Sequence, residues 1–207
     1  MPMQNGLQTN TGDENLGLVG RRRFLGWISA AACGAMFSVR EAKAGLFYST
    51  KAVEGIPKSW VDAKGLDVLR YANYIKALKL KNISPYMVLY PHFKTRGRRR
   101  NSLPPRYMWR NIAATLRVID AVSSRMRAIP KPLVSVYRSP TYNRAVRGRS
   151  QSQHLQNRAV DVQFNGVSAY TVSSVVRKMR AEGRFKGGVG RYSSFTHIDT
   201  RGHNADW

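Results

Sequence analysis

The sequence predicts an α+β fold in which a small antiparallel sheet packs with helices. Two segments, from residue 108 to about 130 and from 168 to 183, carry apolar residues at three- and four-residue spacing, as amphipathic helices do. Short apolar runs of strand length stand at 133–137, 159–164, 187–192 and 195–199. The last two runs are joined by a two-residue turn, which predicts a hairpin and argues against regular strand–helix alternation.

The first 44 residues are predicted to be an export signal. Arg21–Arg23 precede an apolar run from Phe24 to Phe37, and Ala42-x-Ala44 has the small residues of a cleavage site. The paired arginines followed by x-Phe-Leu resemble the twin-arginine signal. An ordinary secretory signal and an uncleaved N-terminal anchor are the alternatives, and Cys33 is a weaker candidate for lipid attachment. We therefore expect a protein of the periplasm or cell envelope that is not an integral membrane protein after cleavage.

Residues 45–107 are predicted to be an N-terminal lead-in that ends in a basic loop. Residues 45–65 have only scattered apolar positions, and 67–81 mix apolar and basic residues without a clean period. The stretch 95–106 is rich in arginine and contains Gly97 and two prolines, so we expect a solvated loop there.

Residues 108–207 are predicted to form the folded functional domain. Its first helix should run for about 17 residues and end near Pro130. Ser168 can cap a second helix that Gly183 terminates, with a buried stripe at Val172, Val175, Val176 and Met179. The strands are expected at Leu133–Tyr137, Ala159–Phe164, Gly187–Tyr192 and Phe195–Asp199.

Composition limits the function classes. The chain has 207 residues, 43% of them hydrophobic, so it can build a core and is not disordered throughout. Its formal charge of +24 favours anionic partners but does not determine the fold. The single cysteine excludes a disulfide scaffold and a cysteine-based metal cluster.

Three residues suggest a metal site. Asp161 lies within the apolar run 159–164, where a carboxylate is costly to bury unless it is paired or bound to a metal. His154 precedes it by seven residues, and His197 lies between Phe195 and Ile198 in a second apolar run. Two imidazoles and one carboxylate suit Zn²⁺ with a fourth position left open, as in catalytic sites. The alternative for each residue is an ordinary core polar group with satisfied hydrogen bonds.

Four blocks of sequence resemble one known family. They are Ser135-x-Tyr137-Arg138-Ser139-Pro140-x-Tyr142-Asn143, then Ser152-Gln153-His154 with Ala159-x-Asp161, then Gly187-Gly188-Val189-Gly190-x-Tyr192, and finally Phe195-x-His197-Ile198-Asp199-Thr200-Arg201-Gly202 with Trp207. Together, over about residues 133–207, they are similar to the zinc D-alanyl-D-alanine carboxypeptidase family of peptidoglycan peptidases. The resemblance implies the α+β hedgehog/DD-peptidase fold.

The resemblance also implies an activity and residue roles. His154, Asp161 and His197 would bind Zn²⁺, which activates a water to attack an amide bond of a peptidoglycan stem peptide, in a carboxypeptidase or an endopeptidase reaction. Arg138 would bind substrate and stabilise the oxyanion. Both D,D and L,D bonds stay open as the bond cleaved.

One position departs from the family pattern. Many members carry an acidic residue or histidine, acting as general base, three residues before the last zinc histidine, and here that position is Ser194. Asp199 is the best substitute, because residues two apart in a strand project from the same face. It could instead hydrogen-bond a ligand imidazole and orient it. His203 is a more distant option.

Other residues near these motifs are weaker candidates. Tyr137, Ser152 and Gln153 are expected to bind substrate and, with Tyr142 and Asn143, to line the cleft, although each could instead serve a turn or the core. His92 is expected to be structural. The rival hypothesis is a non-catalytic module that retains the zinc site and binds an anionic cell-wall polymer through the arginines of 96–106. Nucleic acid is not an expected partner, because no recognition motif is present.

Overall fold

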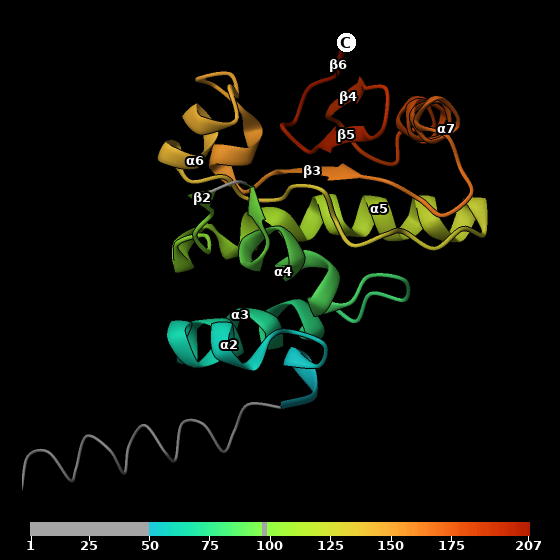
Figure 1. Ribbon diagram of the computed structural model, residues 1–207. Coiled ribbons are helices and arrows are strands. Elements are labelled where there is room, and N and C mark those ends of the chain that lie inside the picture. The colour runs from blue at the N-terminus through green and yellow to red at the C-terminus, as the bar shows by residue number, and fades with distance from the viewer. Residues whose placement is uncertain (1–49, 97–98) are drawn as a thin grey trace, which may run out of the picture. The chain divides into compact units, whose positions relative to one another are not determined.

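The computed structural model describes residues 50–96 and 99–207, which belong to one compact unit (Figure 1). The predicted export signal at 1–44, including Cys33, lies outside the described residues. The described elements are, in chain order, the 3₁₀ helix η1 (Thr50–Val53), α2 (Lys58–Lys64), α3 (Leu66–Ala77), α4 (Pro85–Phe93), β1 (Thr95–Arg96), β2 (Arg99–Arg100), η2 (Arg106–Asn111), α5 (Ile112–Met126), α6 (Pro140–Ala145), η3 (Gln153–Gln156), β3 (Ala159–Val162), α7 (Ala169–Ala181), β4 (Gly188–Arg191), β5 (Thr196–Asp199) and β6 (Ala205–Asp206). Helices and a small sheet confirm the predicted α+β class.

The sheet has the strand order β3-β5-β4-β6. β5 pairs antiparallel with both β3 and β4, and the backbone N–H of Tyr192 donates to the carbonyl of Phe195 at 3.0 Å to close the predicted hairpin. β6 adds a short parallel pairing to β4, so the sheet is mixed where a purely antiparallel one was expected. Residues 200–204 carry the chain from the end of β5 past the start of β4 to this edge, where the N–H of Ala205 donates to the carbonyl of Gly187.

Helices α5 and α7 pack on one face of this sheet (Figure 1). α5 has the predicted periodicity, and its buried residues include Leu116 and Ile119. Ser168 caps α7 as predicted, with its Oγ accepting from the N–H of Thr171, and Gly183 follows the helix with a left-handed φ of 75°. Of the predicted stripe, Val172, Val176 and Met179 are buried and Val175 is partly buried.

The alternation of side chains in the strands places the polar residues on the other face. Val160, Val162 and Ile198 belong to the core with the α5 and α7 residues. Successive strand residues point to opposite faces. Asp161 and His197 therefore point away from the helices, and they lie directly opposite each other in the β3–β5 register.

Most of the described residues before 94 lie in η1, α2, α3 and α4, so the described part of the predicted lead-in is helical and not irregular. In α3, Val68, Tyr71, Ala72 and Ile75 have helical spacing and are buried. Other apolar residues, such as Tyr74, lie beside this stripe and are partly buried, so the helical period is hard to recognise in the sequence. One cluster of buried apolar side chains includes residues from both parts of the chain, from Ala52 in η1 to Ile198 in β5. The N-terminal helices therefore share a single hydrophobic core with the sheet.

The basic stretch 95–106 is not wholly a solvated loop. It contains the two-stranded hairpin of β1 and β2, which Asn101 follows with a buried side chain. His92, at the end of α4, is also buried, as a structural histidine would be.

The predicted strand at Leu133–Tyr137 is also wrong, because it forms only an isolated bridge. Ser135 pairs with Asp161, and two hydrogen bonds join this segment to β3. Its other backbone groups bond elsewhere: the N–H of Leu133 donates to the carbonyl of Met87, and the carbonyl of Val136 accepts from a histidine ring.

Among the described residues, no helix is both long and apolar enough to cross a membrane.

Candidate metal centre

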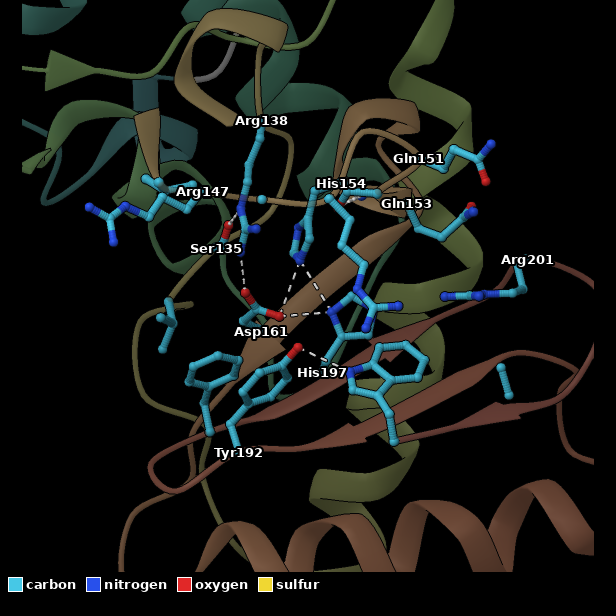
Figure 2. A pocket seen from close by; sticks show the side chains of 18 of the residues that line it. Ser135, Arg138, Arg147, Gln151, Gln153, His154, Asp161, Tyr192, His197 and Arg201 are labelled. Atoms are coloured by element: carbon cyan, nitrogen blue, oxygen red, sulfur yellow. Dashed lines mark hydrogen bonds and ion pairs between the residues drawn. The ribbon is translucent and has the colours of Figure 1, made fainter. Parts of the chain in front are cut away.

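Three side chains from three elements converge on the polar face of the sheet. His154 comes from η3, whose first turn is capped by Ser152, while Asp161 and His197 come from the facing strands β3 and β5. All three are buried, at 2%, 2% and 6% exposure. Figure 2 shows both rings directed at the Asp161 carboxylate. The fold therefore brings the three predicted metal ligands together.

The spacing of the three ligand atoms suits a small metal ion. Nε2 of His154 lies 3.1 Å from Oδ1 of Asp161 and 3.2 Å from Nδ1 of His197, and that Nδ1 lies 2.9 Å from the same Oδ1. Zinc–nitrogen and zinc–oxygen bonds of about 2.0–2.1 Å at tetrahedral angles separate ligand atoms by about 3.3 Å. The observed triangle is slightly tighter than this, and its three atoms can therefore share one ion.

The outer hydrogen bonds of the rings leave lone pairs inside the triangle. Nδ1 of His154 faces the carbonyl oxygen of Val136 at 2.5 Å, and Nε2 of His197 faces Oδ2 of Asp199 at 3.0 Å. Both partners are acceptors, so each of these nitrogens must carry the ring's proton. In neutral rings, Nε2 of His154 and Nδ1 of His197 then present lone pairs to each other and to Asp161. Three acceptors facing one another require a cation or an added proton between them.

The electrostatics of the site favour positive charge at the same place. Burial lowers the pKa of His154, which favours its neutral, metal-binding form. Burial also opposes charge on His197, but the carboxylates of Asp161 and Asp199 raise the pKa of that ring above its ordinary value. Burial alone would raise the pKa of Asp161, yet the two imidazoles hold it well below its usual range. A metal ion would take the place of a proton in this triangle.

Arg138 contacts the other oxygen of the ligand carboxylate. Its Nη2 donates to Oδ2 of Asp161 at 2.5 Å, and its Nε donates to Oγ of Ser135 at 2.7 Å. The arginine thus binds Asp161 on the side away from the imidazoles (Figure 2). This pairing leaves Oδ1 for the ligand triangle.

Asp199 lies behind the His197 ring, outside the triangle. It is fully buried, and Arg201 donates to it from Nε at 2.8 Å and from Nη2 at 2.6 Å. The N–H of Gly188 donates to it at 3.1 Å, and a Cβ on that glycine would lie 2.5 Å from Oδ2. Burial opposes ionisation, but the hydrogen bonds from His197, Arg201 and Gly188 hold the pKa of Asp199 well below its usual range. Asp199 does share a face with His197, as expected, but it contacts the nitrogen that points away from the ligands.

A cavity of about 700 Å³ opens onto the three ligands. Of the residues predicted at the cleft, Arg138, Ser152, Gln153 and Tyr142 line this cavity. Tyr137, at 5% exposure, is not among the residues that line this cavity, so the structure does not place it at the cleft as expected.

Asn143 does not line the cavity; its side chain stabilises a turn. Its side chain is buried, and its Nδ2 donates to the carbonyl of Arg149 in the loop that follows α6. Neither Ser194 nor His203 lines the cavity, and both are exposed. The predicted position of a general base, Ser194, therefore lies outside the cavity.

Several site residues had no role assigned from the sequence. Ser135 bonds the Arg138 guanidinium, and Arg201 bonds Asp199. The indole of Trp207 packs against the His197 ring, with ring centroids 5.1 Å apart, and its Nε1 donates to the Tyr192 hydroxyl at 3.0 Å. Ser135, Arg201, Trp207 and Tyr192 all belong to the sequence blocks that carry the family resemblance, which was the available signal.

The comparisons with known proteins agree with this geometry. The sequence model of the family described as Peptidase M15 matches residues 94–199, which is just over half of the chain and includes all three candidate ligands. No curated protein and no solved structure gave a match. Membership of this family indicates a peptidase, and the described residues offer it a place for a metal ion. The chain belongs to the peptidase M15 family.

Proposed function

We propose that this chain is a zinc metallopeptidase that hydrolyses an amide bond in peptidoglycan stem peptides. The observation that carries the proposal is the triangle of three buried ligand atoms at 2.9–3.2 Å, in which the other nitrogen of each imidazole faces an acceptor outside the triangle. Family membership and the adjoining cavity support the same conclusion. Both carboxypeptidase and endopeptidase action fit a cavity of this size.

The three ligands would hold Zn²⁺, and each is oriented by a neighbour. The Val136 carbonyl and Asp199 fix the ring protons of His154 and His197 on their outer nitrogens. A bound zinc ion would polarise the scissile carbonyl and lower the pKa of water towards about 7. We assign Asp199 to orienting His197 and not to general-base catalysis, because its carboxylate lies on the far side of that ring.

Arg138 would act on both the ligand set and the substrate. It neutralises and orients Asp161, and it lines the cavity beside the three ligands. A guanidinium has five N–H donors, so donors remain for a substrate carbonyl or carboxylate oxygen. Charge that develops on that oxygen during hydrolysis would be stabilised by this fixed cation.

A non-catalytic module that retains the metal site is the second candidate. One observation favours it: among the described residues that line the cavity, the only carboxylates are Asp161 and Asp206. The first is a candidate ligand, and the second is paired with Arg177 and Arg180. In this case the excess of basic residues would bind an anionic cell-wall polymer.

Metal content and peptide hydrolysis distinguish the two candidates. The purified protein should contain about one zinc per chain, and mass spectrometry should detect D-alanine release or cross-link cleavage in peptidoglycan fragments. His154→Ala should lose both zinc and hydrolysis, while His203→Ala, at an exposed histidine outside the cavity, should retain both. Zinc binding with no product from any fragment would support the binding module, and full activity without metal would refute both.

We also propose export through the twin-arginine pathway. The support is the sequence of residues 21–26 together with Ala42 and Ala44. Replacing Arg21 and Arg22 by lysine should leave the protein in the cytoplasmic fraction. Export of this variant at the wild-type level would contradict the proposal.

A further inference from the structure

Asn101, which follows the basic hairpin, makes contacts on both sides of Arg138. Its Nδ2 donates to the carbonyl of Tyr137 at 2.5 Å, and its Oδ1 accepts from the N–H of Ser139 at 3.0 Å. Its side chain is 3% exposed, and 36 to 38 residues of chain separate it from these partners. One amide side chain therefore pairs with the backbone carbonyl just before Arg138 and the N–H just after it.

The backbone at Arg138 needs such a partner because it has left the sheet. The pairing with β3 ends at Ser135, and among the described residues no strand runs alongside 137–139. Buried backbone groups without partners are costly, at about 1–3 kcal/mol each. The remaining N–H, that of Arg138 itself, donates to the carbonyl of His154 at 3.1 Å. Asn101 and His154 thus hold this arginine's main chain from two sides.

The two backbone partners hold the Asn101 amide in one orientation, and His92 packs beside it. Nδ1 of His92 lies 3.4 Å from Nδ2 of Asn101, and both side chains are buried. Burial lowers the pKa of His92 to about 4, so the ring is neutral at neutral pH. The directions of the two backbone hydrogen bonds decide the amide orientation. Turning the amide over would set its oxygen against the Tyr137 carbonyl and its NH₂ group against the N–H of Ser139.

We propose that Asn101 is a positioning residue for Arg138. By fixing the main chain on both sides of Arg138, it keeps the guanidinium against Asp161 and at the cavity wall. Its effect on catalysis rests on the proposed peptidase function, whereas its effect on the position of Arg138 does not. Loss of Asn101 should therefore act on the reaction through Arg138 alone.

The first test reads the position of Arg138 without an activity assay. In the full chain with ¹⁵N-labelled arginine, the Nε–Hε signal of Arg138 is assigned by its absence in Arg138→Lys. Because this N–H donates to Ser135, we expect slow hydrogen exchange in the wild type. Asn101→Ala should shift the signal and speed its exchange at least tenfold. Asn82→Ala is the matched control, since Asn82 also bonds a distant backbone carbonyl, that of Asp120, but away from the site.

The second test is a double-mutant cycle on kcat/KM. A displacement of about 1 Å in a catalytic group can lower the rate about 100-fold, and we expect a loss of this order for Asn101→Ala. In the Arg138→Ala background the same substitution should cost less than threefold, because its target is gone. A merely structural asparagine would lower kcat/KM by the same factor in both backgrounds, which would overturn the proposal.

The two tests separate failure of this proposal from failure of the proposed function. If the wild type cleaves no peptidoglycan fragment, the peptidase function fails, and the Arg138 signal alone decides the role of Asn101. An unchanged Arg138 signal in folded Asn101→Ala refutes that role whatever the activity. If Asn101→Ala does not fold, Asn101→Asp replaces it, because aspartate keeps the volume and the acceptor for Ser139 but lacks the donor for Tyr137. It should also change the signal, and an unchanged signal would refute the role.

Discussion

Acidification should destabilise this protein through His92. The imidazole is fully buried at the end of α4, and burial lowers its pKa from 6.5 to about 4. Above pH 6.5 the ring is neutral in both the folded and the unfolded chain. As the pH falls from 6.5 towards 4, the unfolded chain takes up a proton that the folded protein does not. The free energy of unfolding must therefore fall over this range.

The size of the effect follows from the two pKa values. Each unit of difference corresponds to about 1.4 kcal/mol. At pH 5 the unfolded histidine is almost fully protonated and the folded one is mostly neutral, so about 2 kcal/mol is lost relative to pH 7.5. Near pH 4 the loss approaches about 3 kcal/mol. This is a large share of the 5–15 kcal/mol that is typical of folded domains.

Urea denaturation at pH 7.5 and pH 5.0 measures this loss directly. The comparison is between the wild type and His92→Gln, which has no titrating group at this position but keeps a polar side chain beside Asn101. Both proteins contain the other histidines, whose contributions cancel in the difference. The wild type should lose about 2 kcal/mol more than His92→Gln between the two pH values. Equal losses would show that His92 is not held neutral by burial.

Three further predictions concern the metal site. Chelation should lower the Tm by several degrees in scanning fluorimetry and zinc should restore it, because an ion at 100 times its Kd stabilises by about 2.7 kcal/mol; an unchanged Tm would contradict an ion at this site. Asp199→Asn should weaken zinc affinity 10- to 100-fold in chelator competition, because the carboxylate that fixes the His197 ring is lost; wild-type affinity would show that the ring is held by other contacts. Gly190→Ala should cost about 1–3 kcal/mol in thermal unfolding, because its Cβ would overlap the Trp207 indole; wild-type stability would mean that the indole can move without cost.

The sequence predicted elements well where one local signal dominated. α7 has a Ser cap, a single apolar stripe and a terminal glycine, and all three are found in the structure. α3 has an equally regular stripe, but Leu66, Leu69 and Tyr74 beside it are also partly buried and hide it. Burial on more than one side of a helix erases the contrast on which periodicity depends.

Tertiary hydrogen bonds account for what the sequence could not predict. Leu133–Tyr137 has the composition of a strand, but its carbonyls at Val136 and Tyr137 bond the side chains of His154 and Asn101. The three metal ligands could be proposed from their apolar surroundings. By contrast, the contact of Arg138 with Asp161 depends on how the extended segment sits against β3, which residue spacing does not specify.

If His154, Asp161 and His197 bind a metal ion as proposed, the register of β3 and β5 makes metal loading a readout of correct strand pairing. Asp161 and His197 occupy one rung of the ladder, each directly across from the other. A slip of one residue would move one strand's ligand to the core face, and in its place an apolar neighbour such as Val160 or Ile198 would face the cavity. Misregistered chains would then lack a ligand and hold no ion. Metal content per chain would therefore count correctly paired molecules in any preparation, including one refolded from urea.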